Sequence, residues 1–427
     1  MRVHIIVITS LLLLLPQAML GQTFPSYESK GWWHLFLHGG TIRTRSDDGK
    51  RTGDYYLQVG SDFSLVSFDY VNGFTYGPDL TLGRMLHNKG RLEADVCVEW
   101  SAARQTMMHA LAARYILPPE WQSSVEVFCS SHTDDLNADP LMDISQKQLA
   151  SSLFGWNDFK LYSASRWGVK GTTLLHDDVL FGGALWHEER QEMSNHRKRN
   201  VFRIRGKSNV PMLRGHVPDS LDLGDTKLWR TDLSLTFKPG SRLYIYDDMH
   251  SSWQSLAPTF RLDAKLGWGD DDASGRDAGL RFLSLDLIMQ QCISTDGGKQ
   301  RLGYFASTGF FPIRHWVQVT DMHHFHASHF CWQNHMESSL RWFALLADYE
   351  LSTSRQWFEA HAEYMRRRND LFAHYVQLHL VSVAEHRLHA ELSYGWQLMK
   401  DMRIGLSAGW DGSEFDGLGF NLIFVND

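Results

Sequence analysis

The sequence contains no long apolar run beyond its N-terminal stretch. A membrane-spanning helix needs about 18 or more continuous apolar residues, and no later segment approaches that length. We therefore expect no helical membrane span in the mature chain. The mean hydropathy of -0.31 suits a soluble domain, and it equally suits a barrel in which every second residue faces water.

The sequence also lacks an excess of basic charge, and cysteine is scarce. The net charge of -7 and the pI near 6.3 give no basic surface, so nucleic acid is not expected as a partner. The 4 cysteines lie far apart in the sequence. Cys97 falls on the polar face of its expected strand, whereas Cys129 shares a face with Val125 and Val127, so the two thiols should point in opposite directions. We expect no disulfide framework.

Aromatic residues, in contrast, are abundant. The chain contains 16 Trp, 14 Tyr and 24 Phe among 427 residues. Aromatic belts at the two interfaces of a membrane account for such an excess. Two soluble β domains could also be built from about 400 residues, and they are the alternative at this point.

The N-terminus has the parts of a secretory signal peptide. One arginine precedes an apolar core that ends at Leu15, and small and polar residues follow. We predict a signal peptide over residues 1–21, because the apolar core is too short for a retained anchor. Residues 22–60 are polar and irregular and predict a short periplasmic segment, which leaves residues 61–427 for the main domain.

A two-residue alternation marks the C-terminal region, from Arg387 to Val425. Apolar and aromatic residues occupy one face of each of three expected strands, and charged or small residues mostly occupy the other. An alternating ribbon of about ten residues with interfacial aromatics is typical of a lipid-facing barrel strand. The residues predicted to face lipid are Leu388, Leu392, Tyr394, Trp396, Ile404, Leu406, Trp410, Phe420, Leu422 and Phe424.

The same alternation begins near Asp62 and recurs along the chain, as in the segment from Arg91 to Trp100. Such segments predict about 14 strands, within a range of about 12 to 16, because outer-membrane barrels of bacterial type have even strand numbers. The predicted fold is therefore all-β: an antiparallel transmembrane outer-membrane β-barrel. Its lumen-facing residues should include Glu359, His361, Glu363, Arg387, His389 and Glu391.

Four separate stretches resemble one protein family. They are VNGFTYGPDLTLGRML at 71–86, DPLMDISQKQLASSLFGWNDFKLY at 139–162, HHF at 323–325 and LLADYELSTSRQWFEAHAEY at 345–364. The chain resembles the outer-membrane β-barrel family of Bacteroidota-type bacteria whose function is unknown, and whose long members are labelled carboxypeptidase-like regulatory-domain proteins. Those members carry an N-terminal β-sandwich, for which residues 22–60 leave no room, so the resemblance covers the barrel portion only. It implies no peptidase activity, since a shared barrel does not imply a shared task.

Histidines crowd the segment DMHHFHASHFCWQNH, and imidazole is a good ligand for zinc or copper. His323, His326 and His329 are weak candidates for a metal site, because spacings of three do not share a face on a strand. No zinc-binding motif is present, so we expect no metal and no cofactor. Asn334 and His335 lie near a serine, which leaves a hydrolase at the barrel rim as a minor alternative.

The predicted function is non-enzymatic. Charges of both signs alternate on the inward faces, and interleaved side chains of opposite sign can close a barrel of about 14 strands, whereas open channels belong to barrels of about 16 to 18. We therefore predict a scaffold or accessory component of the cell envelope, and a channel or transporter for small solutes is the alternative. The expected partners are outer-membrane lipid, the barrel-assembly machinery that inserts the chain, and other envelope proteins. The expected location is the cell outer membrane.

Overall fold

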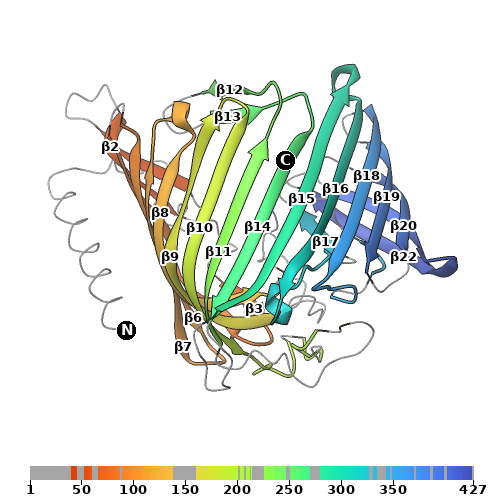
Figure 1. Ribbon diagram of the computed structural model, residues 1–427, viewed down its shortest axis with the longest axis horizontal. Helices are drawn as coiled ribbons and strands as arrows, with labels where there is room; N and C mark the ends of the chain where they lie inside the picture. Colours follow the sequence, from red (N-terminus) through yellow and green to blue (C-terminus); the bar gives the residue numbers. More distant parts are fainter. Residues whose placement is uncertain are drawn as a thin grey trace.

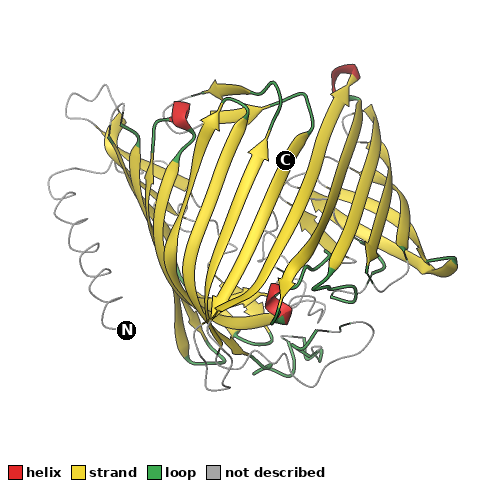
Figure 2. Cartoon of the chain, in the orientation of Figure 1, coloured by secondary structure: helices red, strands yellow, loops and turns green. Residues whose placement is uncertain are grey.

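The computed structural model describes most of the chain from residue 40 onwards. In the residues that it describes, the regular secondary structure is β-strand apart from three short 3₁₀ helices (Figure 2). In the described part of the chain, no helix is long and apolar enough to cross a membrane. The described residues are 40–45, 52–59, 66–86, 89–137, 160–200, 202–205, 208–211, 213, 226–246, 251–269, 279–326, 330–333, 343–346, 349–369, 372–384, 388–398 and 402–425.

The strands form one sheet of 20 and a separate two-stranded hairpin. The long strands coincide with alternating segments of the sequence, because alternation lets one face of a strand pack inward while the other faces outward. Neighbouring long strands are antiparallel and curve around a common axis (Figure 1). The strands of the first half are β1 (Gly40–Arg45), β2 (Thr52–Val59), β3 (Val66–Asp69), β4 (Gly73–Tyr76), β5 (Asp79–Met85), β6 (Arg91–Ser101), β7 (Thr106–Ile116), β8 (Ser124–Asp135), β9 (Leu161–His176) and β10 (Val179–Glu192).

The second half continues the same wall to the C-terminus. The separate hairpin joins β12 to β13 and lies at the top of Figure 1. The 3₁₀ helices are η2 (Pro119–Trp121), η3 (Asp296–Gly298) and η4 (Val319–Asp321). The strands are β11 (Thr226–Phe237), β12 (Arg242–Ile245), β13 (Ser251–Gln254), β14 (Thr259–Gly269), β15 (Gly279–Thr295), β16 (Gln300–Arg314), β17 (Phe330–Gln333), β18 (Gln356–Asn369), β19 (Phe372–Val383), β20 (His389–Leu398), β21 (Met402–Asp411) and β22 (Glu414–Val425).

The sheet contains more hydrogen-bonded segments than the predicted number of strands. β3 pairs with β4, and β4 pairs with β6 beyond the end of β5, so these short pieces continue β2 and β5 rather than widen the wall. β17 pairs with β22 in parallel, unlike the antiparallel wall. The number of hydrogen-bonded segments in the sheet therefore differs from the number of strands that form the barrel wall. The predicted number of about 14 strands is not confirmed.

The sheet begins before residue 61, the predicted start of the barrel. β1 pairs with β2, and β2 pairs with β5. Tyr56 of β2 is 1% exposed, and its hydroxyl donates to a carboxylate oxygen of Glu93 at 2.5 Å. These strands lie within residues 22–60, which had been assigned to a periplasmic segment. Their alternation is short and is interrupted by the polar run TRSDDGKRTGD, so it was not recognised in the sequence.

The two faces of the wall differ in burial. On β20, His389, Glu391 and Ser393 are buried, whereas Leu392 and Tyr394 are each 45% exposed. The same alternation recurs along β18 and β19. A wall of hydrogen-bonded strands with an apolar outer face suits a bilayer, because the backbone groups of neighbouring strands pair with each other and lipid covers the apolar side chains. The predicted fold class is confirmed, and the protein is an outer-membrane β-barrel.

The two ends of the barrel differ in the length of their connections. At one end most connections are short, such as 177–178 between β9 and β10 and 296–299 between β15 and β16, and the exception is 238–258, which carries the hairpin of β12 and β13. The other end has the longest connections, which span 136–160, 193–225 and 315–355, beside short ones such as 412–413 between β21 and β22. We name these ends the short-turn rim and the long-loop rim.

The longest connection joins β16 to β18 and folds back against the inner face of the wall. Its described parts are residues 315–326, 330–333, 343–346 and 349–355, and together we call them the inserted segment. The early part contacts β10, and the later part contacts β20. Through β17 it also pairs in parallel with the C-terminal end of β22 in the sheet.

Candidate functional site

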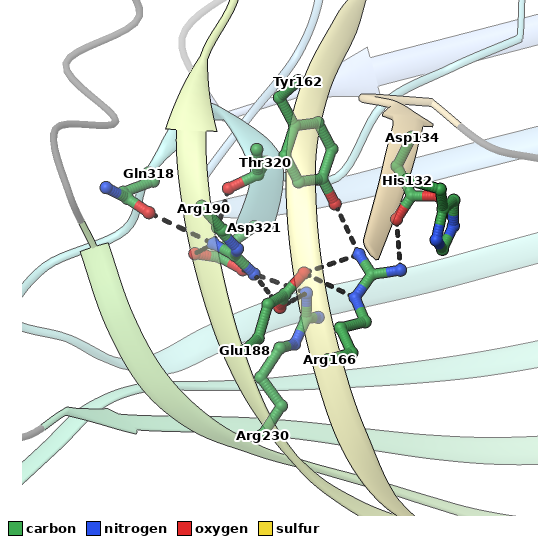
Figure 3. Close-up of polar contacts among 10 residues, drawn as sticks. All are labelled: His132, Asp134, Tyr162, Arg166, Glu188, Arg190, Arg230, Gln318, Thr320 and Asp321. Atoms are coloured by element: carbon green, nitrogen blue, oxygen red, sulfur yellow. Dashed lines mark hydrogen bonds and ion pairs between the residues drawn. The ribbon is translucent and has the colours of Figure 1, made fainter. Parts of the chain in front are cut away.

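The first contact between the inserted segment and the wall is an arginine–carboxylate pair. Arg190 projects inward from β10, and its two terminal nitrogens each donate to one oxygen of Asp321 at 2.8 Å (Figure 3). The same guanidinium donates to the hydroxyl of Thr320 at 2.6 Å and to the side-chain oxygen of Gln318 at 3.1 Å. A bidentate pair fixes orientation as well as distance. The side chains around η4 are therefore held in one position on β10.

The wall supplies further charges behind this pair. Glu188 accepts from the same arginine at 2.9 Å and from Arg166 at 2.7 Å, and Arg166 also contacts Asp134. Arg230 approaches Asp321 at 3.3 Å. Figure 3 shows these side chains converging from β8–β11 and from η4. We call the group the β10 latch, and its members are Asp134, Arg166, Glu188, Arg190, Arg230 and Asp321.

The β10 latch is balanced and buried. Three guanidinium groups face three carboxylates, and Glu188 and Arg190 are each 0% exposed. Removing one partner of a buried ion pair costs about 3 to 5 kcal/mol, because the other charge is left without water or a counterion. Since each charge already has a partner of opposite sign, the arrangement suits a structural contact better than a site for a charged ligand.

A second contact holds the later part of the inserted segment. The carboxylate of Glu391 on β20 accepts hydrogen bonds from the backbone N–H groups of Ala344 at 2.6 Å and of Leu345 and Leu346 at 2.9 Å each. The glycine at 419 makes room for this turn, because a Cβ there would lie 2.5 Å from the side chain of Leu345. Glu391 is 0% exposed, so a single buried carboxylate binds three successive residues of the segment.

Histidines from β18, β19 and β20 lie beneath this turn. The ring centroid of Phe343 is 5.1 Å from that of His361, 5.7 Å from His379 and 5.9 Å from His389. The Nδ1 atoms of His361 and His379 are 2.8 Å apart, so one ring donates and the other accepts. Nε2 of His361 lies 3.3 Å from Glu359. We call the group the histidine seat, and its members are Glu359, His361, His379, His389 and Glu391.

Another histidine ties two parts of the inserted segment together. Nε2 of His324 donates to the backbone carbonyl of Val319 at 2.7 Å, and Nδ1 lies 2.7 Å from the hydroxyl of Ser352. Burial lowers the pKa of His324 to about 4, because a charged ring would lose its hydration here. His324 is therefore neutral at physiological pH, and its Nδ1 accepts a hydrogen bond from the serine.

A third contact joins the inserted segment to the end of β8. The hydroxyl of Tyr349 donates to a carboxylate oxygen of Asp135 at 2.8 Å, and the side-chain amide of Asn137 donates to the carbonyl of Phe325 at 3.1 Å. All four residues are buried. The inserted segment is thus attached to the wall at β8, β10 and β20.

The lumen beside β5–β9 is open, in contrast. A cavity of about 770 Å³ is lined by inward side chains of these strands. Arg114 in its wall pairs with Glu93 at 3.1 Å, with Asp95 at 3.0 Å and with Glu126 at 2.7 Å. Lys170 pairs with Glu126 at 2.9 Å and keeps 53% of its side chain exposed. The same alternation of charges therefore forms a hydrated surface on this side.

The residues predicted to face the lumen fall on its packed side. Each one that the structure describes is between 0% and 4% exposed. The sequence suggested contact with a polar lumen, but protein covers these side chains, because residues 343–346 pack over β18–β20. The described ones are Glu359, His361, Glu363, His389 and Glu391, and Arg387 lies outside the described residues.

The residues predicted to face lipid lie on the other face of the last strands. Leu388, Leu392, Tyr394, Leu406 and Phe420 are between 45% and 59% exposed. These apolar side chains provide the outer surface that lipid would cover. Trp396, Ile404 and Trp410 are partly exposed, and the side chains of Leu422 and Phe424 lie outside the described residues.

The weak metal candidates are not brought together. The ring of His323 stacks on Trp357 with centroids 4.1 Å apart, and the backbone carbonyl of His326 accepts a hydrogen bond from Phe343. His329 lies outside the described residues. Among the side chains that the structure describes, no three metal-ligating groups converge.

Sequence reasoning missed the β10 latch. The alternation does place Glu188 and Arg190 on one face, which was the signal available. Asp321 is 131 residues away from Arg190 and belongs to no alternating segment. A contact of this range leaves no local pattern, so only the folded chain reveals it.

Several solved structures are similar to the chain at low sequence identity. No curated protein matches the chain. Among solved structures it is similar to BamA from Haemophilus ducreyi lacking POTRA domains 1-3, with 8% identity and a TM-score of 0.42 over 94% of this chain and 73% of that one. CdiB from Acinetobacter baumannii is similar at 10% identity and a TM-score of 0.39, over 84% of this chain and 57% of that one. Wzi from Escherichia coli, a carbohydrate-binding β-barrel, gives 10% identity and a TM-score of 0.36, over 90% and 76%.

The family comparison covers most of the chain. The C-terminal domain of DUF5686, a family of unknown function, matches residues 34–395. The match begins before β1 and ends within β20, so it includes the β10 latch, the inserted segment and the histidine seat. The chain therefore belongs to the DUF5686 family of unknown function, and it corresponds to the C-terminal domain of that family.

Proposed function

We propose that the protein is a non-enzymatic scaffold or accessory barrel of the cell envelope. The observation that carries this proposal is the attachment of the inserted segment across the lumen. Arg190 and Asp321 form a buried bidentate pair at one side, and Glu391 binds three backbone N–H groups at the other. A segment anchored at both sides by buried charges supports a barrel that is occluded at rest.

The setting of the barrel is part of the same proposal. Residues 1–21 act as a cleaved signal peptide, and the barrel-assembly machinery then inserts the chain into the outer membrane of a bacterium of Bacteroidota type. The apolar N-terminal stretch supports export. Outer-membrane barrels have short periplasmic turns and longer extracellular loops, so the short-turn rim faces the periplasm. Other envelope proteins would be the partners of such a barrel.

A channel for small solutes is the second candidate. The cavity of about 770 Å³ beside β5–β9 favours it, because this part of the lumen already holds space. Its wall carries both signs of charge, as Arg114 shows by pairing with three carboxylates. Selective pores present a ring of one sign or a wide aqueous bore, so a pore here would discriminate little between anions and cations.

The described ionisable groups inside the barrel support a role without catalysis. The carboxylates of the β10 latch are paired with arginines, and Glu391 is used in binding backbone N–H groups. The rim hydrolase alternative rested on Asn334 and His335, which lie outside the described residues. Non-enzymatic function is therefore the proposal that the described contacts favour.

Conductance in a planar bilayer tests the proposal. The purified barrel should be silent, because the inserted segment occupies the lumen, and it should co-purify with envelope proteins after mild cross-linking. Folded protein is verified by a shift in SDS-gel mobility on boiling. Stable single-channel steps that disappear when the sample is heated beforehand would favour the channel instead.

A further inference from the structure

We propose that a polar cleft in the outer face of the wall binds the sugar headgroup of a membrane glycolipid. The cleft lies between β7 and β8 on the long-loop side of the barrel, next to a cluster of aromatic rings. This inference goes beyond the scaffold role, because it assigns the barrel a specific lipid ligand and the place that holds it. It does not depend on whether the lumen is occluded or open.

The cleft forms where two neighbouring strands separate. Within the described residues, the pairing of β7 with β8 runs from Ile116 opposite Ser124 to His109 opposite Ser131, and both strands continue beyond this point. There β7 stays paired with β6, and β8 stays paired with β9. A cavity of about 260 Å³ is lined by Met107 on one strand and by Ser131 on the other. The separation of the two strand ends therefore leaves a cleft.

The polar side chains of the cleft belong to the outer face of the wall. Arg166 of β9 projects inward to Glu188, so Ser165 and Trp167 on either side of it project outward. Trp167 is accordingly 45% exposed. Ser163 follows the same alternation, and both serines line the cleft. The strands that carry these side chains, β8, β9 and β10, lie side by side (Figure 1).

Aromatic rings mark the height of the membrane on this part of the wall. The rings of Trp167, His187 and Trp229 cluster with centroids 5.1 to 5.8 Å apart, and we call this group the tryptophan belt. A second aromatic pair, Phe237 with Phe260, lies nearer the short-turn rim. Trp229 and Phe237 are eight residues apart on β11, about 27 Å along the strand, which a tilt of about 40° reduces to about 20 Å in height. The apolar band of such barrels is about 25 Å tall, so the two aromatic groups mark its two interfaces.

The cleft lies at the level of lipid headgroups. Ser165 pairs with Glu189 of β10, two residues beyond Trp167 and His187 towards the long-loop rim. Two residues correspond to about 7 Å along a tilted strand and to about 5 Å in height. On the other side of the tryptophan belt the outer face is apolar, and Leu185 is 40% exposed there. A lipid whose head occupies the cleft would therefore lay its acyl chains along this apolar surface.

The side chains of the cleft suit a ligand with many hydroxyl groups. Four hydroxyls and one amide line it, and groups of both kinds can donate and accept hydrogen bonds. A sugar hydroxyl also donates and accepts, so each of its hydroxyls can match a group of the cleft. The residues concerned are Thr106, Ser131, Ser163, Ser165 and Gln191.

The charges at the cleft favour an uncharged sugar over a phosphate. Glu189 pairs with Lys227 at 3.0 Å, and 49% of its side chain is exposed, so its carboxylate can accept a further hydrogen bond from a sugar hydroxyl. Arg104 already donates to the side chain of Asn72 at 3.2 Å. A phosphate in the cleft would meet the carboxylate of Glu189 as well as these two cations, whereas a sugar places no charge beside it.

Lipid retention in native mass spectrometry tests the site. The barrel is reconstituted in nanodiscs that contain equal amounts of digalactosyl diacylglycerol and phosphatidylethanolamine with the same acyl chains, and it is then released into the gas phase. Wild type should retain the galactolipid in preference. Ser165→Val should lower this retention by at least about fivefold, because it removes a hydroxyl and adds a methyl group to the cleft. Thr231→Val is the matched control, since Thr231 follows Trp229 on the outer face of β11, on the apolar side of the tryptophan belt.

Two outcomes overturn the proposal. One is equal retention of the two lipids by wild type, or a preference for phosphatidylethanolamine. The other is equal retention of the galactolipid by wild type and by Ser165→Val in a barrel that still shows its heat-dependent gel shift. Ser163→Val takes the place of Ser165→Val if the latter lacks that shift. Retention is measured without conductance or partners, so the lipid site can fail while the scaffold role stands, and the reverse holds too.

Discussion

The two sides of the lumen use the same residue types in different environments. On the packed side, the inner faces of β18–β21, Arg403 pairs with Glu363 at 2.9 Å and both side chains are fully buried. On the open side, the inner faces of β5–β9, Arg114 pairs with Asp95 at 3.0 Å, and these side chains are 32% and 27% exposed. The distances are alike. Only the surroundings differ, and they decide what each pair contributes to stability.

The comparison shows two separate causes. The alternation of the sequence determines which side chains point inward, and the inserted segment determines whether these inward side chains are buried or hydrated. The sequence pattern is the same for the inward-facing charged residues of β6 and of β20, so it does not show which of them are buried. Residues 343–346 cover one side, whereas a cavity of about 770 Å³ remains at the other. Substitutions of similar chemistry should therefore have different effects on the two sides.

The largest effect is expected at the β10 latch. Arg190→Met removes the guanidinium between Glu188 and Asp321 and leaves two buried carboxylates with fewer counterions. The free energy of unfolding should fall by about 3 to 5 kcal/mol. Urea unfolding of the barrel in detergent measures it, with the heat-dependent gel shift as the check on folding. A loss below about 1 kcal/mol would mean that the latch is not buried as the structure has it.

The two faces of β20 provide the next comparison. Leu392→Arg places a charge on the exposed apolar face, and it should cost about 2 to 4 kcal/mol at the bilayer midplane. Glu391→Gln would lower the free energy of unfolding only slightly if the Glu391 side chain were hydrated. Because Glu391 instead accepts three backbone N–H bonds, we expect its loss to cost about 1 to 3 kcal/mol. Unfolding in lipid vesicles gives both values, and a negligible cost for Glu391→Gln would place that carboxylate on the open side.

His324 makes the packed side sensitive to acid. Burial lowers the pKa of His324 to about 4, so the folded state resists protonation while an unfolded chain takes up a proton below about pH 6.5. The stabilising effect is therefore complete above about pH 6.5 and falls by about 3 kcal/mol as the pH drops to about 4. His324→Gln should remove this part of the pH dependence. Unfolding free energies of both proteins at several pH values measure it, and parallel pH profiles would contradict the assignment.

The smallest effect is expected at a solvent-exposed ion pair on β14. Arg261→Met breaks a pair with Asp263 at 2.7 Å, but the arginine side chain is 51% exposed. Solvent screens such pairs, so the free energy of unfolding should change by about 0 to 1 kcal/mol. The same urea series used for Arg190→Met makes the two results directly comparable. Equal costs at both positions would abolish the distinction between buried and solvent-exposed ion pairs.

Much of the wall could be predicted from the sequence, because a two-residue period directly encodes which face of a strand points inward. β6 and β20 are clear examples, and Glu391 and Leu392 lie on opposite faces as the alternation requires. The start of the sheet could not be predicted, since β1 and β2 are short and flank a polar stretch of sequence. The inserted segment could not be predicted either. Its contacts, such as Tyr349 with Asp135 across 214 residues, depend on which segments meet in the folded barrel.

The most direct test compares one buried and one open inward position by thiol labelling. In a variant whose native cysteines are replaced by serine, Ser393→Cys reports on the packed side, where the serine is 1% exposed, and Ser130→Cys reports on the lining of the cavity. A small hydrophilic thiol reagent should modify the cysteine at 130 rapidly and the one at 393 only after unfolding. Equal rates in the folded barrel would contradict the division of the lumen into a packed and an open side.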